Sequence, residues 1–271
     1  MTAQSPLGRP TTQPQQYSPE SLWPIARAES RSILGLSEPL PFHGIDIWNA
    51  WELTWLAPGG LPRVAMAEMR VPADSPNIVE SKSMKLYLAS FAMIHQESIN
   101  DVRATIARDL GECAGSTVDV RLTSAADTDR RNAEPLPGDS LDDIDVDCDT
   151  WRVDADLLHA DPDTVVTETL HTDLLRSLCP VTGQPDSGSV LIRYRGPRIE
   201  RAALTRYIVS YRQHSDFHEN CVERMFVDLV DRCRPEALTV YARFQRRGGI
   251  DINPFRSNFE QDPPNLRLWR Q

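Results

Sequence analysis

The pattern of apolar and polar positions in the first half of the chain predicts two strands, two helices and a third strand. The expected segments are strands at residues 45–56 and 61–71, helices at 83–91 and 100–113, and a strand at 117–122. The first two strands are rich in aromatic and aliphatic side chains and flank Gly59-Gly60, which favours a hairpin turn. Apolar side chains then recur at helical spacing, and Ser98 or Asn100 is suited to begin the second helix.

The second half of the chain repeats this order. Its expected segments are an extended run at residues 163–178, a strand at 189–194, helices at 200–211 and 218–233, and a strand at 238–244. Pro235 ends the second helix, because proline lacks the backbone N–H that a helix needs.

An offset of 120 residues aligns the helical parts of the two halves. The matching pairs are Val79 and Ile199, Glu80 and Glu200, Met84 and Leu204, Tyr87 and Tyr207, Leu88 and Ile208, Ser90 and Ser210, Phe91 and Tyr211, Val102 and Val222, and Ile106 and Phe226. Their apolar members are spaced as on one face of a helix. One offset fits both helices, which indicates a duplicated module of strand, strand, helix, helix and strand.

Such a module predicts an α+β fold in which helices pack on one face of an antiparallel sheet. Residues 1–38 are rich in Pro, Gln, Ser and Thr and are interpreted as a flexible N-terminal arm. The two modules are then expected at residues 39–140 and 141–271. Residues 124–143, rich in Asp, Arg, Pro and Gly, are expected to be a linker or a long loop.

Composition narrows the class of protein. The 271 residues are 40% hydrophobic, enough for a packed core, and no apolar run approaches the ~20 residues that span a bilayer. The polar N-terminus shows no apolar signal core, so a cytoplasmic protein without a membrane partner is expected. A formal net charge of −10 argues against direct nucleic-acid binding. Five cysteines, odd in number and widely spaced, argue against a disulfide framework or a zinc ribbon.

Cys179 is the strongest candidate nucleophile. Pro180 favours an extended Cys179, and the prolines and glycines that follow bend the chain so that Asp186 can return near the thiol. A thiol beside a carboxylic acid suits nucleophilic attack followed by proton donation. The alternative is a buried cysteine that precedes a polar turn.

Phe217-His218-Glu219 is a second candidate site. The Glu219 carboxylate is able to accept hydrogen bonds from the ring N–H groups of a heterocycle, on which Phe217 would stack. Alternatively, Glu219 only complements the dipole of the helix start. His218 and Cys221 have the spacing of two metal ligands, but no further ligands accompany them, so no metal is expected.

The third candidate is the stretch of residues 243–249, where arginines precede Gly248-Gly249. Such a turn is able to cradle a phosphate, although a charged strand edge explains the pattern equally well. Among the 29 basic residues only Lys82 and Lys85 are lysines, which singles them out as candidate cation sites.

Together these motifs resemble a known family. Glu80-Ser81-Lys82, Cys179 with Asp186, Phe217-His218-Glu219 and Arg246-Arg247-Gly248-Gly249 are similar to the NADPH-dependent 7-cyano-7-deazaguanine (preQ0) reductases of queuosine biosynthesis. The resemblance covers residues 40–271 and fits the long form of these nitrile oxidoreductases, which has two modules.

The resemblance implies a tandem tunnelling fold (T-fold) and reduction of the preQ0 nitrile to the amine preQ1 by two NADPH. It implies that Cys179 forms a thioimide with the nitrile and that Asp186 donates protons. Further roles follow by residue: Glu219 and His218 hold the deazaguanine, Val79, Glu80 and Ser81 line the substrate pocket, and Ser81, Lys82, Arg247 and Gly248 contact NADPH. Family members form homo-oligomers, with a dimer favoured here.

Two other functions stay open. A GTP cyclohydrolase-like enzyme of the same fold would also hold a purine-like ring with a glutamate, but it would hydrolyse its substrate, with zinc in the best-known type. A binding or scaffold protein built of duplicated modules would need no reactive cysteine. Zinc content and thiol reactivity distinguish these alternatives.

Overall fold

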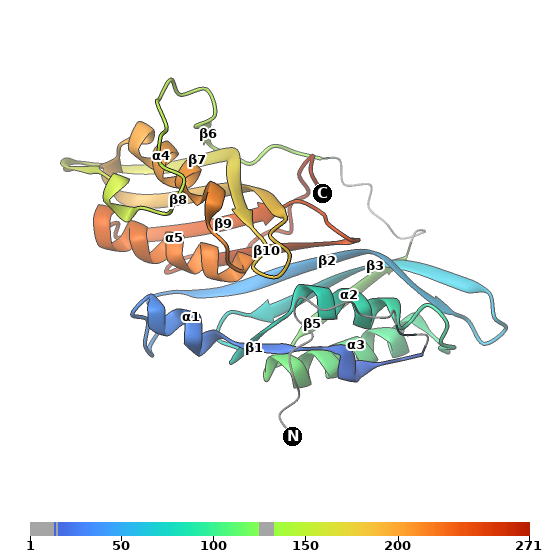
Figure 1. The fold of residues 1–271 in the computed structure, drawn as a ribbon. Helices are drawn as coiled ribbons and strands as arrows, with labels where there is room; N and C mark the ends of the chain where they lie inside the picture. Colours follow the sequence, from blue (N-terminus) through green and yellow to red (C-terminus); the bar gives the residue numbers. More distant parts are fainter. Residues whose placement is uncertain (1–13, 15, 125–132) are drawn as a thin grey trace. The chain divides into compact units, whose positions relative to one another are not determined.

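The computed structural model describes residues 14, 16–124 and 133–271 (Figure 1). Its strands are β1 (Pro24–Ala26), β2 (His43–Leu56), β3 (Pro62–Pro72), β4 (Asn77–Val79), β5 (Asp119–Ser124), β6 (Asp139–Ser140), β7 (Ala160–Leu178), β8 (Pro185–Ile199), β9 (Ala237–Phe244) and β10 (Ile250–Ser257). Its helices are α1 (Arg27–Ile33), α2 (Ser81–Ala89), α3 (Ile99–Ala114), α4 (Arg201–Ser210) and α5 (His218–Cys233), with 3-10 turns η1 (Pro19–Ser21), η2 (Ala155–Leu157) and η3 (Tyr211–Gln213). None of the helices in the described ranges is long and apolar enough to cross a membrane.

The chain divides into two compact units. The first comprises residues 1–29, 46–131 and 246–251, and the second comprises residues 30–45, 132–245 and 252–271. Each half of the chain has the predicted order, β2, β3, α2, α3 and β5 in one and β7, β8, α4, α5 and β9 in the other, so the α+β class is confirmed. The compact units do not decide where the sequence modules begin and end, and the boundaries 39–140 and 141–271 remain predictions.

In the first unit, strands lie in the order β5, β3, β2, and β3 pairs antiparallel with β5. α2 and α3 lie on the same side of this sheet (Figure 1). The apolar residues that predicted the helices are their fully buried positions: Met84 and Tyr87 on α2, and Val102 and Ile106 on α3. Ser98 caps α3 as predicted, because its hydroxyl accepts a hydrogen bond from the Asp101 N–H.

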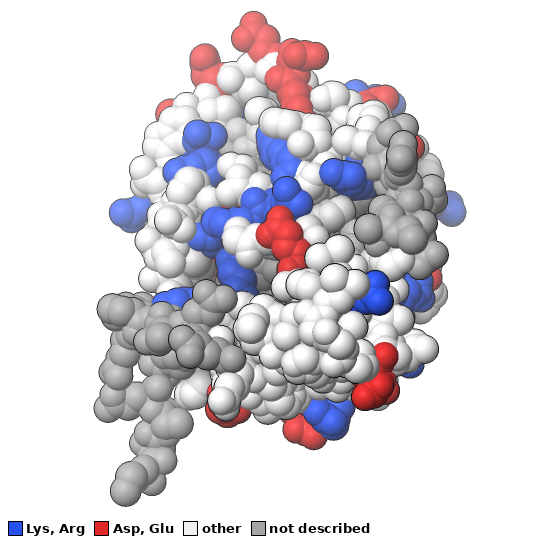
Figure 2. Space-filling model, turned by 90° about the vertical axis from the view of Figure 1, so that its right-hand side faces the viewer, with Lys and Arg blue, Asp and Glu red and all other residues white. Residues whose placement is uncertain are grey.

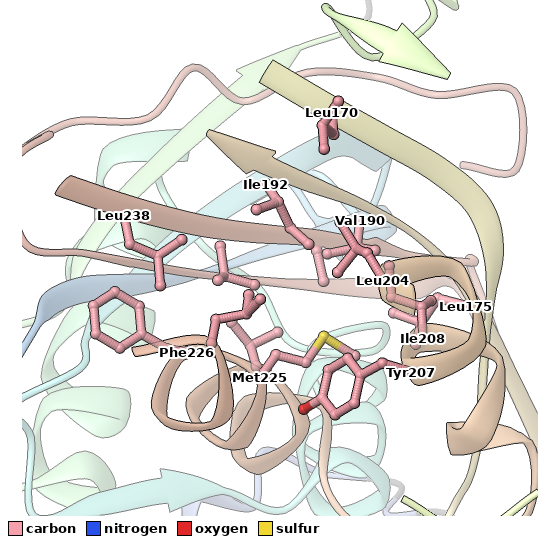
Figure 3. Close-up of a cluster of buried hydrophobic side chains, with 14 of the residues drawn as sticks. Leu170, Leu175, Val190, Ile192, Leu204, Tyr207, Ile208, Met225, Phe226 and Leu238 are labelled. Atoms are coloured by element: carbon pink, nitrogen blue, oxygen red, sulfur yellow. The ribbon is translucent and has the colours of Figure 1, made fainter. Parts of the chain in front are cut away.

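In the second unit, strands lie in the order β10, β9, β8, β7, β6, and α4 and α5 cover one side (Figure 1). β7 and β8 form a long antiparallel hairpin. Val190 and Ile192 of β8 and Leu238 of β9 pack on Met225 and Phe226 of α5 in a fully apolar cluster (Figure 3). This burial fixes the face of α5, because apolar area removed from water is the main driving force for packing.

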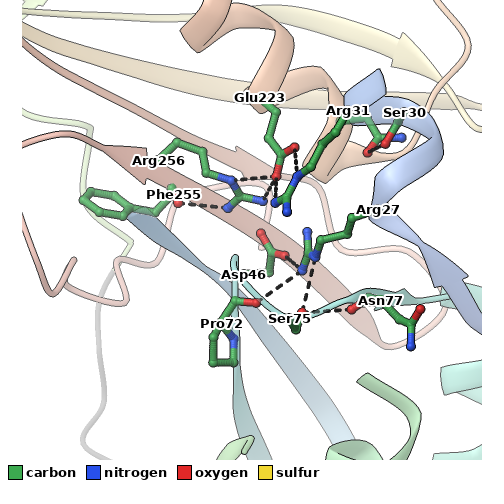
Figure 4. A network of polar contacts seen from close by, with 11 residues as sticks. Arg27, Ser30, Arg31, Asp46, Pro72, Ser75, Asn77, Glu223, Phe255 and Arg256 are labelled. Atoms are coloured by element: carbon green, nitrogen blue, oxygen red, sulfur yellow. Dashed lines mark hydrogen bonds and ion pairs between the residues drawn. The ribbon is translucent and has the colours of Figure 1, made fainter. Parts of the chain in front are cut away.

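The interpretation of residues 1–38 as a flexible arm does not hold for residues 19–33. β1 pairs with β4, and Arg27 donates a 2.6 Å hydrogen bond to the buried Asp46 carboxylate (Figure 4). The pattern was missed because β1 has only three residues and because α1 is held by buried arginines instead of an apolar stripe. Residues 1–13 and 15 lie outside the described part of the chain.

Two further differences concern β10 and the expected linker. β10 was not predicted, because its sequence contains Pro254 and four polar residues, although all eight of its residues are buried. Residues 125–132 of the expected linker lie outside the described residues, and its described part includes the short strand β6.

Candidate active site

Cys179 lies in the tight loop that joins β7 to β8. Leu178 pairs with Pro185, and Ser177 pairs with Asp186, so the loop consists of residues 179–184. The Cys179 N–H donates to the Gln184 carbonyl at 2.9 Å, and the Cys179 carbonyl accepts from the Gly183 N–H at 2.9 Å. Gly183 has a φ of 67°, which favours glycine at that position. The chain therefore turns back between Cys179 and Asp186, as the sequence predicted, and Cys179 is 6% exposed.

Leu178, which precedes Cys179, forms backbone hydrogen bonds with the segment that leads into α5. The Leu178 N–H donates to the His214 carbonyl at 2.8 Å, and the Leu178 carbonyl accepts from the Asp216 N–H at 3.2 Å. The Asp216 carboxylate in turn accepts from the Phe217 N–H at 2.8 Å. The hairpin end at Cys179 is thus tied by backbone hydrogen bonds to the start of α5.

Asp216 is held in its ionised form. Burial raises the pKa of this carboxyl group, but hydrogen bonds from His214, Asn220 and the Phe217 N–H outweigh burial and lower the pKa below its ordinary value. A carboxylate at this point also satisfies N–H groups at the start of α5, which Phe217 does not cap with its side chain.

Asp186 and His218 lie together. Asp186 is 3% exposed, and its Oδ2 atom is 3.2 Å from Nε2 of His218. The distance is that of an ion pair, although the angle is not that of a hydrogen bond. The sequence predicted both residues but not their contact. A buried carboxyl group beside an imidazole is a pair that is able to share and transfer one proton.

The orientation of the His218 ring is set from β9. The ring stacks on Phe244 with 3.8 Å between centroids and 14° between planes. Gly188 pairs with Phe244 across β8 and β9, and a Cβ atom at Gly188 would lie 3.1 Å from the Phe244 ring. The absent side chain at Gly188 therefore makes room for the ring that supports His218.

Glu219 follows His218 in the first turn of α5 and is buried. Three other thiols in the described part of the chain are poor nucleophiles. Burial raises the pKa of Cys221 well above its ordinary value, and it raises the pKa values of Cys113 and Cys233 to about 11. These thiols stay protonated at neutral pH, which supports their interpretation as incidental.

The residues predicted to bind substrate or cofactor in the first unit surround the start of α2. Val79 is buried at the end of β4, and Ser81 is the first residue of α2. The Glu80 carboxylate caps α2, accepting from the Lys82 N–H at 2.9 Å and from the Ser83 N–H at 2.7 Å. Glu80 therefore has a structural role, and its assignment to the substrate pocket with Val79 and Ser81 stays a prediction.

A pocket of about 180 Å³ lies beside α2 in the first unit. It is lined by Ala50, Glu52, Leu53, Lys85, Leu88, Ala89, Gly248, Gly249 and Ile250. Gly248 and Gly249 have φ values of 64° and 82°, and a Cβ atom at Gly248 would lie 3.1 Å from Cε of Lys85. The turn is thus open to the approach of Lys85, and a lysine beside glycine backbone suits an anionic group.

Arg243 is not part of such a cradle. Its guanidinium is buried and donates to the Tyr241 hydroxyl at 2.7 Å and to Asn265 Oδ1 at 2.9 Å. The arginines of residues 243–247 therefore differ in role, and only Arg246 and Arg247 accompany the glycine turn. Basic side chains are plentiful on the face drawn in Figure 2, although the chain is acidic overall.

Within the described ranges, no group of three or more His, Cys, Asp or Glu side chains is arranged to hold a metal ion. The expected independence of metal stays a prediction.

Comparisons with known proteins agree with these motifs. Residues 13–122 match the family model described as nitrile reductase, 7-cyano-7-deazaguanine-reductase N-term, and residues 185–263 match the model described as QueF-like protein. The NADPH-dependent 7-cyano-7-deazaguanine reductase of Paraburkholderia phytofirmans is 53% identical over 270 residues, which cover 99% of this chain and 98% of that protein. The protein of the same name from Burkholderia lata is 54% identical over 269 residues, 98% of each chain.

The chain belongs to the 7-cyano-7-deazaguanine reductase family. A solved structure titled archaeosine synthase QueF-Like, in the apo form, has 18% identity and a TM-score of 0.31, covering 36% of this chain and 96% of its own. That similarity carries no argument about the fold. In this reductase family member, the sequence motifs located Cys179, Asp186, His218 and Glu219, all in the second unit.

Sequence reasoning missed the residues that orient this candidate site. Phe244 and Gly188 meet only through the register of β8 and β9, which no local pattern encodes. Asp216 was the one detectable omission, because it directly precedes Phe217-His218-Glu219 and Asp is common before a helix start.

Proposed function

We propose that this chain reduces the nitrile of 7-cyano-7-deazaguanine (preQ0) to the primary amine of preQ1, with NADPH as reductant, in queuosine biosynthesis. The observation that carries the proposal is identity above 50% with reductases of that name over nearly the whole length of both chains. The four motif residues of the second unit lie at one hairpin end and one helix start, which backbone hydrogen bonds tie together, and this placement supports the same reaction.

Cys179 starts the reaction in this proposal. Its thiolate adds to the nitrile carbon, a C–S bond forms, and a proton from Asp186 reaches the nitrile nitrogen to give a thioimide. Burial of Asp186 beside His218 supports the role, because the pair is able to hold a proton next to the hairpin end. After the first reduction the C–S bond breaks, the thiolate leaves and an imine remains for the second reduction.

NADPH supplies a hydride at each of the two reductions, so conversion of a nitrile to an amine consumes two NADPH. Ser81, Lys82, Arg247 and Gly248 would hold the cofactor. Lys82 and Lys85 of α2 carry positive charges that suit its phosphate groups, and Lys85 lies beside the glycine turn at residues 248–249.

Glu219 and His218 would hold the deazaguanine ring, with the Glu219 carboxylate accepting from ring N–H groups. Cys179, Asp186 and Glu219 are all buried, which suits a reaction whose imine would otherwise hydrolyse. Val79, Glu80 and Ser81 are proposed to contribute to the substrate pocket.

The fold proposed for this activity is a tandem T-fold, supported by the recurrence of strand, strand, helix, helix and strand in both halves of the chain. A homo-oligomer, with a dimer favoured, and a cytoplasmic location complete the proposal. Neither a membrane nor a direct nucleic-acid partner is part of it.

A spectrophotometric assay of the purified chain with preQ0 and NADPH tests the function. Oxidation of two NADPH for each preQ1 formed is expected, with full activity after exhaustive chelation. Substrate turnover without NADPH oxidation, together with stoichiometric zinc, would instead favour a cyclohydrolase-like enzyme.

A further inference from the structure

A buried carboxylate on α5 binds two arginines at once. Glu223 accepts from Nε of Arg31 at 2.9 Å and from Nη2 of Arg31 at 2.7 Å (Figure 4). It also accepts from Nε of Arg256 at 3.1 Å and from Nη2 of the same residue at 2.9 Å. Arg31 reaches it from α1, and Arg256 reaches it from β10. All three residues belong to the second unit.

Phe42 completes this group. The guanidinium carbons of Arg31 and Arg256 lie 5.9 and 5.7 Å from the centre of its ring, and the ring packs edge-on against Phe226 of α5. Buried charges are tolerated only when their hydrogen bonds are nearly complete. The forked contact of Arg31 with Glu223 therefore adds a directional constraint on α5 at this point, beside its apolar packing.

A second contact from the same segment reaches the first turn of α5. The Ser30 hydroxyl donates to Oδ1 of Asn220 at 3.0 Å, and Nδ2 of Asn220 donates to Oδ1 of Asp216 at 2.7 Å. Asp216 binds the Phe217 N–H and the backbone of Leu178, next to Cys179. Residues 30 and 31 thus contact the first two turns of α5.

The position of these contacts on α5 relates them to substrate binding. Glu223 lies four residues after Glu219, so the two project from the same face of α5 in successive turns. Loss of the fork at Glu223 would shift the first turns of α5 slightly within its apolar packing, and His218 and Glu219 would move with them. NADPH is proposed to bind elsewhere, at residues of the first unit, and would not sense this movement.

We infer that Arg31, assisted by Ser30, is a positioning residue that sets affinity for the deazaguanine through α5. The inference rests on the proposed function, since it names the substrate whose ring Glu219 would hold. Lysine at position 31 would keep the charge but lose the fork, because an ammonium cannot make the two parallel contacts of a guanidinium.

Arg27 offers a matched control. It lies on the same helix as Arg31, and the two are 2% and 7% exposed. Like Arg31 it pairs with a buried carboxylate, at 2.6 Å from Asp46. Arg27 and Asp46 belong to the first unit, and neither is a candidate site residue. Lysine at position 27 therefore disrupts an equally buried pair without touching α5.

The test compares Arg31→Lys with Arg27→Lys, each in the full chain that also carries Cys179→Ala to prevent covalent capture. Calorimetry measures dissociation constants for preQ0 and for NADPH, and thermal unfolding measures stability. Arg31→Lys is expected to weaken preQ0 binding by about 10-fold, within the ~100-fold that small misplacements produce. NADPH affinity is expected to stay within about 2-fold in both variants, and Arg27→Lys is expected to keep preQ0 affinity.

Equal preQ0 affinity in the two lysine variants would overturn the inference while leaving the proposed function intact. Absence of preQ0 binding in the Cys179→Ala parent, joined with no turnover in the unmodified chain, would overturn the proposed function itself. If Arg31→Lys fails to fold, Ser30→Ala replaces it, with preQ0 binding expected to weaken by roughly 3-fold. Unchanged preQ0 affinity in Ser30→Ala would then count against the inference.

Discussion

The two long hairpins of the molecule end in the same backbone arrangement, with alanine in one and cysteine in the other. The Ala57 N–H donates to Leu61 at 2.9 Å, and the Ala57 carbonyl accepts from Gly60 at 2.8 Å. Cys179 makes the same two kinds of hydrogen bond, with Gln184 and Gly183, both at 2.9 Å. Each residue is followed by proline, and the second loop is longer by one residue.

The residue before each loop is held in the same manner. Leu56 donates to the Ile94 carbonyl and accepts from the Gln96 N–H, both at 2.9 Å, as Leu178 does with His214 and Asp216. The backbone geometry around the cysteine is therefore a property of the module and exists without any chemistry. What makes the second unit a candidate catalytic centre is the set of side chains placed on that backbone.

The helix starts show where the two units diverge. α3 begins at the half-buried Ile99 and is capped by Ser98, whereas α5 begins at His218 and the buried Glu219 and has no side-chain cap from Phe217. A side-chain cap stabilises a helix start. In the second unit the position of that cap is occupied by Phe217, and the carboxylate of the preceding Asp216 accepts a hydrogen bond from the Phe217 N–H. In the second unit, the candidate catalytic groups therefore occupy a helix start that a capping serine stabilises in the first unit.

Removing the thiol should have the largest effect. Cys179→Ala is expected to abolish turnover, and it should also abolish the covalent adduct that preQ0 forms in the absence of NADPH. Intact-protein mass spectrometry measures the adduct. Cys113→Ala serves as the control, because burial raises the pKa of Cys113 to about 11 and this thiol should not react.

The comparison of hairpins supplies a sharper version of that experiment. Ala57→Cys, introduced together with Cys179→Ala, places a thiol on the same backbone arrangement without the companions Asp186 and His218. No adduct and no turnover are expected. Recovery of either would mean that hairpin geometry alone activates a thiol, and that the second unit holds no special set of partners.

Loss of a cation at the proposed cofactor site should come next. Lys82→Ala and Arg247→Ala are each expected to raise the KM for NADPH by a factor that reflects ~1.5–3 kcal/mol, the contribution of a charged hydrogen bond. The KM for preQ0 should change far less. Steady-state kinetics with each substrate varied in turn measures the difference, and unaltered NADPH kinetics in both variants would remove these residues from the site.

The buried tyrosines of the two units provide a stability test. Tyr207 donates to Asp228 at 2.6 Å and shares a hydrogen bond with Tyr211, so Tyr207→Phe should lower the free energy of unfolding by about 1–3 kcal/mol. Tyr87 donates to Asp109 at 2.6 Å, but Asp109 also binds Tyr17 and Arg108. Tyr87→Phe should therefore lower it less, by roughly 0.5–1.5 kcal/mol. Denaturant unfolding of both variants measures the two losses. A larger loss in Tyr87→Phe would contradict the argument that the other partners of Asp109 compensate for the missing hydroxyl.

Glu80 and Glu200 occupy equivalent positions before α2 and α4 but differ in use. Glu80 accepts two backbone hydrogen bonds, and Glu200 makes no side-chain cap. Glu80→Ala should lower the free energy of unfolding by about 1 kcal/mol, and Glu200→Ala should change it by less than about 0.5 kcal/mol. Chemical denaturation of the paired variants checks this, and equal losses would contradict the capping role of Glu80.

The smallest expected effect is the pH dependence that Asp216 contributes. Its folded-state pKa lies below the ordinary 3.8, so its ionised form stabilises the fold above that pH and loses this contribution as pH falls through the folded pKa. Asp216→Asn should be less stable than the parent by under about 1 kcal/mol at neutral pH. The difference in stability between the two proteins should disappear in acid, and thermal unfolding measured from neutral to acidic pH would show this. A difference that stays constant with pH would mean that the charge of Asp216 does not contribute to stability.

Local sequence pattern predicted the elements whose faces differ in polarity. The amphipathic helices α2 to α5 and the hairpins of each half were readable for that reason. β10 was not, because Pro254 and buried polar residues interrupt its apolar positions, and α1 was not, because arginines occupy its inward positions. The chemical motifs located Cys179 and Asp186, while the contact of Asp186 with His218 depends on tertiary packing between β8 and α5.

The near-complete burial of Cys179 affects how the protein can be labelled chemically. Small, linear electrophiles are the reagents suited to a thiol that is 6% exposed, and bulky maleimides would meet the more open Cys148 first. The number of maleimides incorporated would then report surface modification, and activity would survive it. A slender alkylating reagent, used with preQ0 as a protectant and read by peptide mapping, would give an occupancy measure for the nucleophile itself.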